Sequence, residues 1–285
     1  MPSTFPRALA PLARLFAIGL ASAACAATPA PAPRAAPTAT GGLVPAGARL
    51  VDLTHAFDAD TIVWPTEEPF QLVEEARGVT DRGFFYASNR FAGPEHGGTH
   101  LDAPMHFARD ASTVDRIALD RLIGPAVVVD VSAPCAEDRD HRITLADLER
   151  WERAHGPIPR RAIVLLATGF GRFWPDRARY MGTAKRGPEA VGDLHFPGLA
   201  ADAAAWLVEA RDVRAVGIDT ASIDHGPSTT FDAHRTLAAH EVPAFENVAN
   251  LEQLPPTGAT VIALPMKIGG GTGAPLRAVA IVPPP

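Results

Sequence analysis

Between Pro94 and Phe107 the chain reads P-E-H-G-G-T-H-L-D-A-P-M-H-F, and no other segment constrains the fold as strongly. Four of its side chains belong to types that bind a divalent metal or transfer a proton near neutral pH: His96, His100, Asp102 and His106. In an extended chain side chains alternate between two faces, so these even-numbered residues would share one face. A helix would turn Asp102 away, and the two glycines and Pro104 disfavour one. We therefore predict an extended metal-binding segment; the alternative is a histidine-rich surface loop.

The first 45 residues have the pattern of an export signal followed by a linker. Arg7 and Arg14 precede the apolar run L-F-A-I-G-L-A-S-A-A at residues 15–24, which is too short to span a bilayer. Small residues follow, so we predict a signal peptide over residues 1–27 and an exported, periplasmic protein with no membrane span after cleavage. Residues 28–45 are rich in proline and alanine and are predicted to be a linker.

The two cysteines bear on the mode of export. Cys25 offers lipid attachment as an alternative to plain secretion, but Ser22 stands where such a signal normally has leucine. Cleavage after Cys25 leaves Cys135 unpaired, so no disulfide is expected within the mature chain. Cys135 lies in S-A-P-C-A-E-D without an obvious base beside it, which predicts an inert thiol.

Residues 46–285 have the pattern of a single α/β domain with a mixed β-sheet and flanking helices, because apolar β-branched runs alternate with amphipathic ones. Strands are predicted over residues 49–55, 126–132, 162–169, 215–220, 260–268 and 277–282, and helices over 113–123, 144–155 and 199–210. The aperiodic segment up to Phe91 predicts a long hairpin or a mobile flap. The glycine-rich G-G-G-T-G at 269–273 lacks the lysine and the following helix of a phosphate loop, so we predict a hairpin turn.

Composition narrows the class of partner. The apolar fraction of 47% is that of an ordinary globular protein. The formal net charge of −6 and the lack of a basic stripe exclude a nucleic-acid-binding surface. The expected partner is a small-molecule substrate.

A second polar segment can complete the metal site. Residues 231–251 read F-D-A-H-R-T-L-A-A-H-E-V-P-A-F-E-N-V-A-N-L. Asp232 can cap a short helix that carries His234, Pro243 would end this helix, and Glu246 would lie on the extended segment that follows. Taken alone, His234 and Glu246 are more typical of solvated surface groups. The first cluster favours their assignment as ligands.

Candidate substrate contacts come from aromatic residues and from a loop histidine. Trp64, Phe85 and Tyr86 can form an aromatic wall for a flat substrate, with core packing as the alternative for Trp64. His225 lies in I-D-H-G-P-S, a sequence typical of a loop at a strand end, where pockets form.

The segment H-G-G-T-H-L-D-A-P-M-H resembles the signature H-x-G-T-H-x-D-x-P-x-H of the cyclase-like metal-dependent hydrolases, which include bacterial kynurenine formamidase and isatin hydrolase. The similarity extends over residues 51–282, through V-D-L-T-H, G-I-D-T, E-N-V-A-N-L and I-A-L-P-M-K-I. The resemblance implies His106 as the catalytic acid/base and the following metal ligands: His96, His100, Asp102, His234 and Glu246. It also implies the family's β/β/α, swivelling-domain-like fold and a homodimer or homotetramer in which one subunit lines the pocket of another.

These residues predict an exported metal-dependent hydrolase of a carbon–nitrogen bond in a cyclic amide, lactam or aryl formamide. One or two Zn²⁺ or Mn²⁺ ions would lower the pKa of bound water to about 7, and the hydroxide would attack the carbonyl. His106 would pass the proton to the leaving nitrogen. The alternatives are a lactonase or dehydratase with the same site, and a periplasmic protein that binds a small anion through the metal. A binding protein has no need of His106, which favours an enzyme.

Overall fold

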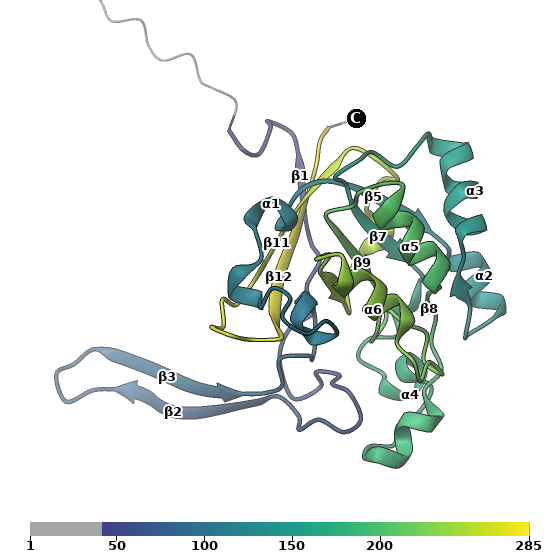
Figure 1. Cartoon of the computed structure of the whole chain (residues 1–285). Coiled ribbons are helices and arrows are strands. Elements are labelled where there is room, and N and C mark those ends of the chain that lie inside the picture. The colour runs from purple at the N-terminus through teal and green to yellow at the C-terminus, as the bar shows by residue number, and fades with distance from the viewer. Residues whose placement is uncertain (1–41, 285) are drawn as a thin grey trace, which may run out of the picture. The chain divides into compact units, whose positions relative to one another are not determined.

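The computed structural model describes residues 42–284 (Figure 1). The predicted signal peptide and most of the predicted linker lie outside the described residues. From Leu43 onward the chain forms one compact unit, and its architecture confirms the prediction of a single domain with a mixed sheet and flanking helices. No helix within residues 42–284 has the length and apolarity needed to cross a membrane.

An eight-stranded mixed sheet forms the centre of the domain, in the order β1–β12–β11–β5–β7–β9–β10–β4. Its strands are β1 (Arg49–Asp52), β4 (His100–Asp102), β5 (Ile123–Asp130), β7 (Ile163–Ala167), β9 (Ala215–Ile218), β10 (Ala244–Glu246), β11 (Ala259–Pro265) and β12 (Gly273–Val282). The four strands β5, β7, β9 and β10 run parallel, and the remaining pairings are antiparallel. Because β12 also pairs with β4, the sheet closes on itself.

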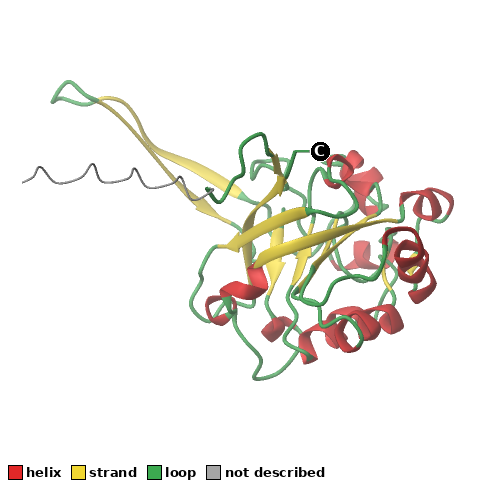
Figure 2. Cartoon of the chain, turned by 90° about the horizontal axis from the view of Figure 1, so that it is seen from above, coloured by secondary structure: helices red, strands yellow, loops and turns green. Residues whose placement is uncertain are grey.

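The β-branched runs become central strands because both of their faces are buried. Val127 and Val129 of β5 pack into a core beneath the helices, whereas Val128 packs with Leu165 into a second core enclosed by the closed sheet. The helices α3 (Leu145–His155), α5 (Ala201–Glu209) and α6 (Asp232–Ala239) lie together on one side of the sheet (Figures 1 and 2). Shorter elements connect them: α2 (Ser132–Glu137), α4 (Arg177–Met181), the paired β6 (Arg142–Ile143) and β8 (Gly198–Leu199), and 3-10 turns at Phe170–Phe173, Pro188–Asp193 and Leu251–Gln253.

The ends of α3 follow the prediction closely. The Thr144 hydroxyl accepts a hydrogen bond from the Asp147 backbone, and the Asp147 carboxylate accepts one from the Thr144 backbone, which completes a capping box. Gly156, with φ of 86°, ends the helix. These local signals are sufficient to set both ends.

The predicted helix over residues 113–123 is only partly present. A 3-10 turn at Val114–Arg116 and the four-residue helix α1 (Leu119–Leu122) take its place, and Ile123 already begins β5. The run from Ile123 becomes a strand because it pairs with β11 and β7, and Pro125 lacks the N–H that a continuing helix would need.

The histidine segment is also less extended than predicted. Strand β4 comprises only residues 100–102, and a 3-10 turn at Pro104–His106 follows it. Pro104 occupies the first position of this turn, where its fixed φ suits helical geometry. His106 therefore reaches the other histidines from a turn rather than from a continuous strand.

The segment predicted as a long hairpin or a mobile flap is a hairpin. Strands β2 (Gln71–Val79) and β3 (Phe85–Ala92) pair with each other and with no other described strand. This arm projects away from the body of the domain (Figures 1 and 2). The predicted hairpin turn at residues 269–273 likewise joins β11 to β12.

Candidate metal centre

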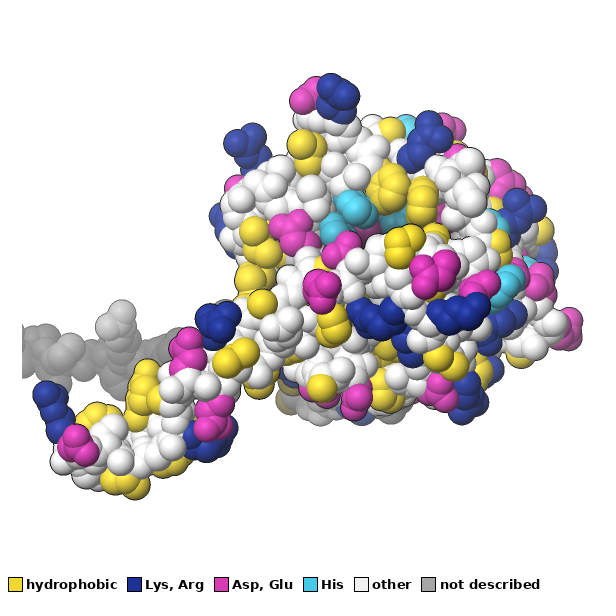
Figure 3. Space-filling view, turned by 90° about the horizontal axis from the view of Figure 1, so that it is seen from below, with side chains coloured by type: hydrophobic (Ala, Val, Ile, Leu, Met, Phe, Trp, Pro, Cys, Tyr) yellow, Lys and Arg dark blue, Asp and Glu magenta, His cyan; other side chains and the backbone are white. Residues whose placement is uncertain are grey.

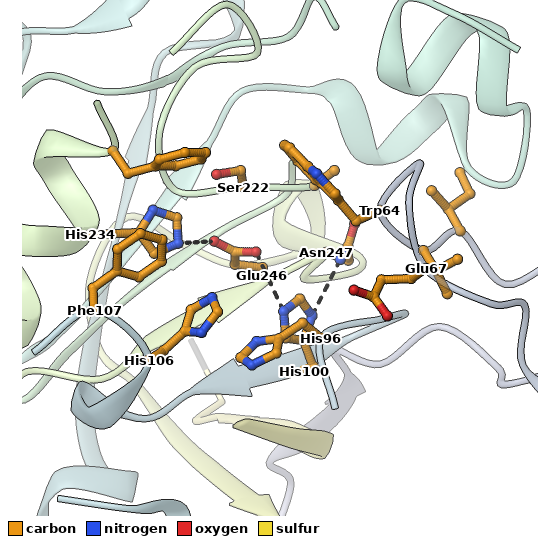
Figure 4. Close-up of a pocket in the computed structure, with 14 residues that line it drawn as sticks. Trp64, Glu67, His96, His100, His106, Phe107, Ser222, His234, Glu246 and Asn247 are labelled. Carbon is orange, nitrogen blue, oxygen red and sulfur yellow. Dashed lines mark hydrogen bonds and ion pairs between the residues drawn. The ribbon is translucent and has the colours of Figure 1, made fainter. Parts of the chain in front are cut away.

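Strand pairing brings the two predicted ligand segments together. β10 runs antiparallel to β4, and its register places Glu246 directly opposite His100. Residues 100 and 102 point to the same face of β4. The structure thus gathers all six predicted metal and catalytic residues at one place: His96, His100, Asp102, His106, His234 and Glu246 (Figure 4).

His100 is held with one ring nitrogen facing the two buried carboxylates. Its Nδ1 donates to the Gly98 carbonyl at 2.9 Å, and the Asn247 amide donates to the same carbonyl at 2.7 Å. The opposite nitrogen, Nε2, is buried without a hydrogen-bond partner among the described residues. It lies 3.2 Å from Asp102 Oδ1 and 3.4 Å from Glu246 Oε2. Its lone pair is therefore available to a cation.

His96 is oriented by a hydroxyl that can only accept from it. The Thr272 hydroxyl donates its proton to Glu95 at 2.7 Å, so it accepts from His96 Nε2–H at 3.0 Å. The other nitrogen, Nδ1, lies 2.6 Å from Asp102 Oδ1. A cation bound by both groups would take the place of this contact.

His234 is oriented by Asp224, whose carboxylate accepts from His234 Nδ1 at 2.6 Å. The same carboxylate accepts the backbone N–H groups of Ala233 and His234, at 3.0 and 3.1 Å, and so caps α6. This corrects the prediction that Asp232 is the cap; Asp232 is the first helical residue. His234 Nε2 points inward, 3.0 Å from both Asp102 Oδ2 and Glu246 Oε1.

The three imidazoles thus share one arrangement that fits a divalent cation. Each has its outer nitrogen bonded to a partner outside the site and its inner nitrogen directed at Asp102, Glu246 or both. Burial raises the pKa of Asp102, but the surrounding imidazoles lower it further, to well below its usual range. Burial lowers the pKa of His100, and the two carboxylates reverse this and raise it to about 8. In the metal-free protein a proton therefore occupies the place that a cation would take.

The donors fall into two groups that share one carboxylate. His96, Asp102 and His106 form one group and His100, Asp102 and Glu246 the other, with ligand atoms within 4.8 Å of one another in each. The two oxygens of Asp102 face different imidazoles, His96 and His234. This geometry suits either one cation or two cations bridged by Asp102.

His106 stands beside the other candidate ligands, at the exposed edge of the site. Its ring stacks on that of His96, with centroids 3.8 Å apart and planes inclined by 20°. Desolvation lowers the pKa of His106 to about 4, against the raising influence of the Asp102 carboxylate. The imidazole is therefore neutral at pH 7 and able to accept a proton.

A cavity of about 190 Å³ opens above the ligands, and its walls are aromatic. Trp64, as predicted, lines it, together with Phe107 and Phe231. Figure 3 shows histidine side chains within this hollow, with hydrophobic side chains at its border. Phe107 and Phe231 were not predicted, although Phe107 directly follows His106 and Phe231 directly precedes α6. Their position next to His106 and close to His234 in the sequence was the one signal that could have identified them as residues of the cavity wall.

Three predicted substrate contacts lie elsewhere in this chain. Phe85 and Tyr86 belong to β3, and the projecting arm carries them away from the cavity with 63% and 51% of their surface exposed. His225 lines a separate polar cavity of about 220 Å³ with Arg142. The side chain of the preceding residue, Asp224, points the other way and contacts His234 of α6. Of these two neighbours, Asp224 therefore contacts the metal site and His225 does not.

Comparison with known proteins places this site in a family. The Cyclase family model matches residues 51–225. An isatin hydrolase of Roseibium aggregatum is 35% identical over 209 residues, which cover 70% of this chain and 77% of that protein. A kynurenine formamidase of Salinibacter ruber is 33% identical over 235 residues, or 81% of this chain and 96% of that protein. The solved structure of isatin hydrolase A from Ralstonia solanacearum has a TM-score of 0.75 at 33% identity and covers 83% of this chain and 92% of that chain. The chain belongs to the cyclase family and is a metal-dependent hydrolase of carbon–nitrogen bonds other than peptide bonds.

Proposed function

We propose that this hydrolase cleaves the amide bond of a flat aromatic compound, either a cyclic amide or lactam of the isatin type or an aryl formamide. One observation carries the proposal: an aromatic-walled cavity lies directly above three imidazoles whose inner nitrogens converge on two buried carboxylates. The relatives named isatin hydrolase and kynurenine formamidase support the same substrate class.

The residues of the chain divide the chemistry among them. A divalent cation held by the five ligands polarises the amide carbonyl and acidifies a water molecule when bound. Trp64, Phe107 and Phe231 bind the ring and exclude bulk water. His106 accepts the proton of the attacking water and donates it to the nitrogen as the carbon–nitrogen bond breaks. The products are a carboxylate and an amine.

The substrate class is tested with a panel of N-formylanilines, isatin-type lactams and lactones. We expect turnover of at least one of the two nitrogen-containing groups by the metal-loaded protein, measured by the ultraviolet absorbance of the aromatic amine, which is released from an N-formylaniline and formed by ring opening of a lactam. Turnover of lactones alone would favour a lactonase instead. Turnover of none of the three groups would contradict the proposed substrate class.

For the metal, we propose Zn²⁺ or Mn²⁺ because the donor set contains nitrogen and oxygen but no thiolate. Cys135 lies outside the site, and burial raises the pKa of its thiol to about 12, which leaves it inert as predicted. Elemental analysis of protein purified without chelators identifies the ion, and the ratio of metal to protein distinguishes one site from two.

For localisation, we propose export to the periplasm, on the sequence pattern of residues 1–27. An exported enzyme would act on a cyclic amide outside the inner membrane rather than in cytoplasmic tryptophan breakdown. Fractionation of cells that express the full chain, with mass spectrometry of the new N-terminus, tests this. An unprocessed protein in the cytoplasm would contradict it, and a lipid on Cys25 would support the lipoprotein alternative.

For assembly, we propose a homodimer or homotetramer held together by the β2–β3 arm. An isolated two-stranded hairpin is marginally stable in water, yet this arm exposes large apolar side chains: Leu72, Val79, Phe84, Phe85, Tyr86 and Phe91. A second subunit that covers the arm would bury them and would give Phe85 and Tyr86 access to a partner's cavity.

The assembly proposal is tested by light scattering after size exclusion. Phe85→Asp should lower the measured mass to that of one chain, about 30 kDa for the full sequence. Leu119→Asp, at an equally exposed apolar position on α1, serves as the control and should leave the mass unchanged. A wild-type protein that already elutes as one chain would contradict the proposal.

A further inference from the structure

The carboxylate of Glu67 lies at the cavity but is not one of the candidate metal ligands. Glu67 lines the cavity and is exposed to solvent within it. Figure 4 shows its side chain beside Trp64, on the side of the cavity opposite Phe107 and His234. Its carboxylate has no hydrogen bond and no ion pair with any residue that the structure describes.

The other carboxylates of the site differ from Glu67 in this respect. Asp102 contacts three imidazoles. Glu246 contacts His234 and His100 and accepts the backbone N–H of Ile223 at 2.7 Å. The charges of Asp102 and Glu246 are therefore already paired with the imidazoles of the site. Glu67 is the carboxylate of the cavity lining that remains available to a bound molecule.

The turn that carries Glu67 is held from outside the cavity. Arg177 of α4 donates to the Val63 carbonyl at 2.9 Å, and Gly187 N donates to the Pro65 carbonyl at 2.9 Å. Arg186 donates to the backbone carbonyl of Glu67 itself. Three hydrogen bonds to backbone carbonyls thus fix the turn, so that Trp64 and Glu67 keep a constant relation to the metal ligands.

We propose that Glu67 selects substrates that carry a positively charged nitrogen, an ammonium group on a short substituent of the aromatic ring. This inference rests on the proposed function, because it places the reacting amide at the metal ligands and the ring against Trp64. A ring in that position brings its substituents to the neighbouring Glu67. A carboxylate without a protein partner attracts a cation and rejects an anion, and both effects favour an ammonium-bearing substrate.

The kinetic test compares substrates that differ only in charge. N-formylanilines with an aminomethyl group at the ortho, meta or para position are compared with their hydroxymethyl counterparts. For the best position, wild-type protein should show a kcat/KM about fivefold higher for the ammonium compound, the upper end of what an ion pair at a solvent-exposed site contributes. Glu67→Gln should remove this preference, mainly through KM, and should leave kcat/KM for the hydroxymethyl compound within about twofold of wild type.

Glu68→Gln is the matched control. Glu68 is the next residue of the same turn, is exposed and does not line the cavity, so its replacement makes the same change in net charge. The control should keep the wild-type preference. An equal loss in Glu68→Gln would show a long-range effect of charge and would overturn the assignment to Glu67. So would a Glu67→Gln loss of equal size for both substrates, which would make Glu67 part of the metal or proton machinery.

A binding measurement separates this inference from the proposed function. Calorimetric titration of the metal-loaded protein with 4-(aminomethyl)benzoate and 4-(hydroxymethyl)benzoate requires no turnover, because the carboxylate of each probe resembles the product. Wild type should bind the ammonium probe about fivefold more tightly, and Glu67→Gln should bind the two equally. If no amide is hydrolysed but this difference is found, the proposed function fails and the role of Glu67 stands. Equal binding of both probes to wild type would refute the role of Glu67 directly.

Discussion

Replacing Asp224 by asparagine should weaken metal binding while leaving the fold almost intact. The two oxygens of Asp224 accept three hydrogen bonds, from the Ala233 and His234 backbones and from His234 Nδ1. Asparagine has one oxygen. This oxygen can keep the two hydrogen bonds that His234 donates to Oδ2. The NH₂ group then faces the Ala233 N–H, which loses its acceptor, and the negative charge next to His234 Nδ1 is lost.

The size of the effect follows from these contacts. Loss of a carboxylate that orients a ligating imidazole typically costs 10- to 100-fold in metal affinity, which corresponds to about 1.4–2.8 kcal/mol. One lost bond at the start of α6 costs roughly 1 kcal/mol of stability, because asparagine is itself a good capping residue. The loss of affinity should therefore exceed the loss of stability.

The assay is a competition titration of the metal against a chromophoric chelator, with urea denaturation of the metal-free protein measured in parallel. Asp232→Asn is the control, because Asp232 lies on the same helix, is exposed and contacts Thr230 rather than His234. A metal affinity of Asp224→Asn within twofold of wild type would refute the conclusion that Asp224 positions His234.

Three further predictions follow from the same geometry. His100→Ala should abolish both metal content and activity, since it removes an imidazole whose inner nitrogen is otherwise unpartnered; full occupancy by elemental analysis would contradict this. His106→Ala should retain the metal and bind a product analogue while turnover falls by ~10² or more; loss of the metal would make His106 a ligand and leave the base to be found elsewhere. Burial raises the pKa of Asp147, but its bonds to Thr144 and Arg150 lower it further, so its net shift is downward. Its stabilising contribution is therefore present above the unfolded pKa of about 3.9 and is lost as the pH falls through the folded pKa. Asp147→Asn should be less stable than wild type to urea at pH 7, and the difference should shrink toward pH 3; an equal difference at both pH values would refute this.

The sequence by itself determined those features that depend on neighbours along the chain. The capping box at Thr144 and Asp147 is one example, because both of its bonds close within three residues. The central strands are another example, because a continuous run of apolar β-branched residues indicates a strand even when the strands that pair with it are not known. The spacing from residue 96 to residue 106 also indicated a metal site, even though the turn at Pro104 replaces the predicted extended backbone.

Only the tertiary structure decided how the ligands are held and what surrounds them. The hydroxyl that orients His96 belongs to Thr272, 176 residues away, and reaches it because β12 pairs with β4. Local sequence favours Asp232 as the cap of α6. Asp224 takes that role because the loop between the two residues folds back onto the start of the helix. The predicted aromatic wall was only partly right for the same reason, since the projecting arm removes Phe85 from the cavity. Such contacts depend on strand register and loop closure between distant segments, and no local periodicity records them.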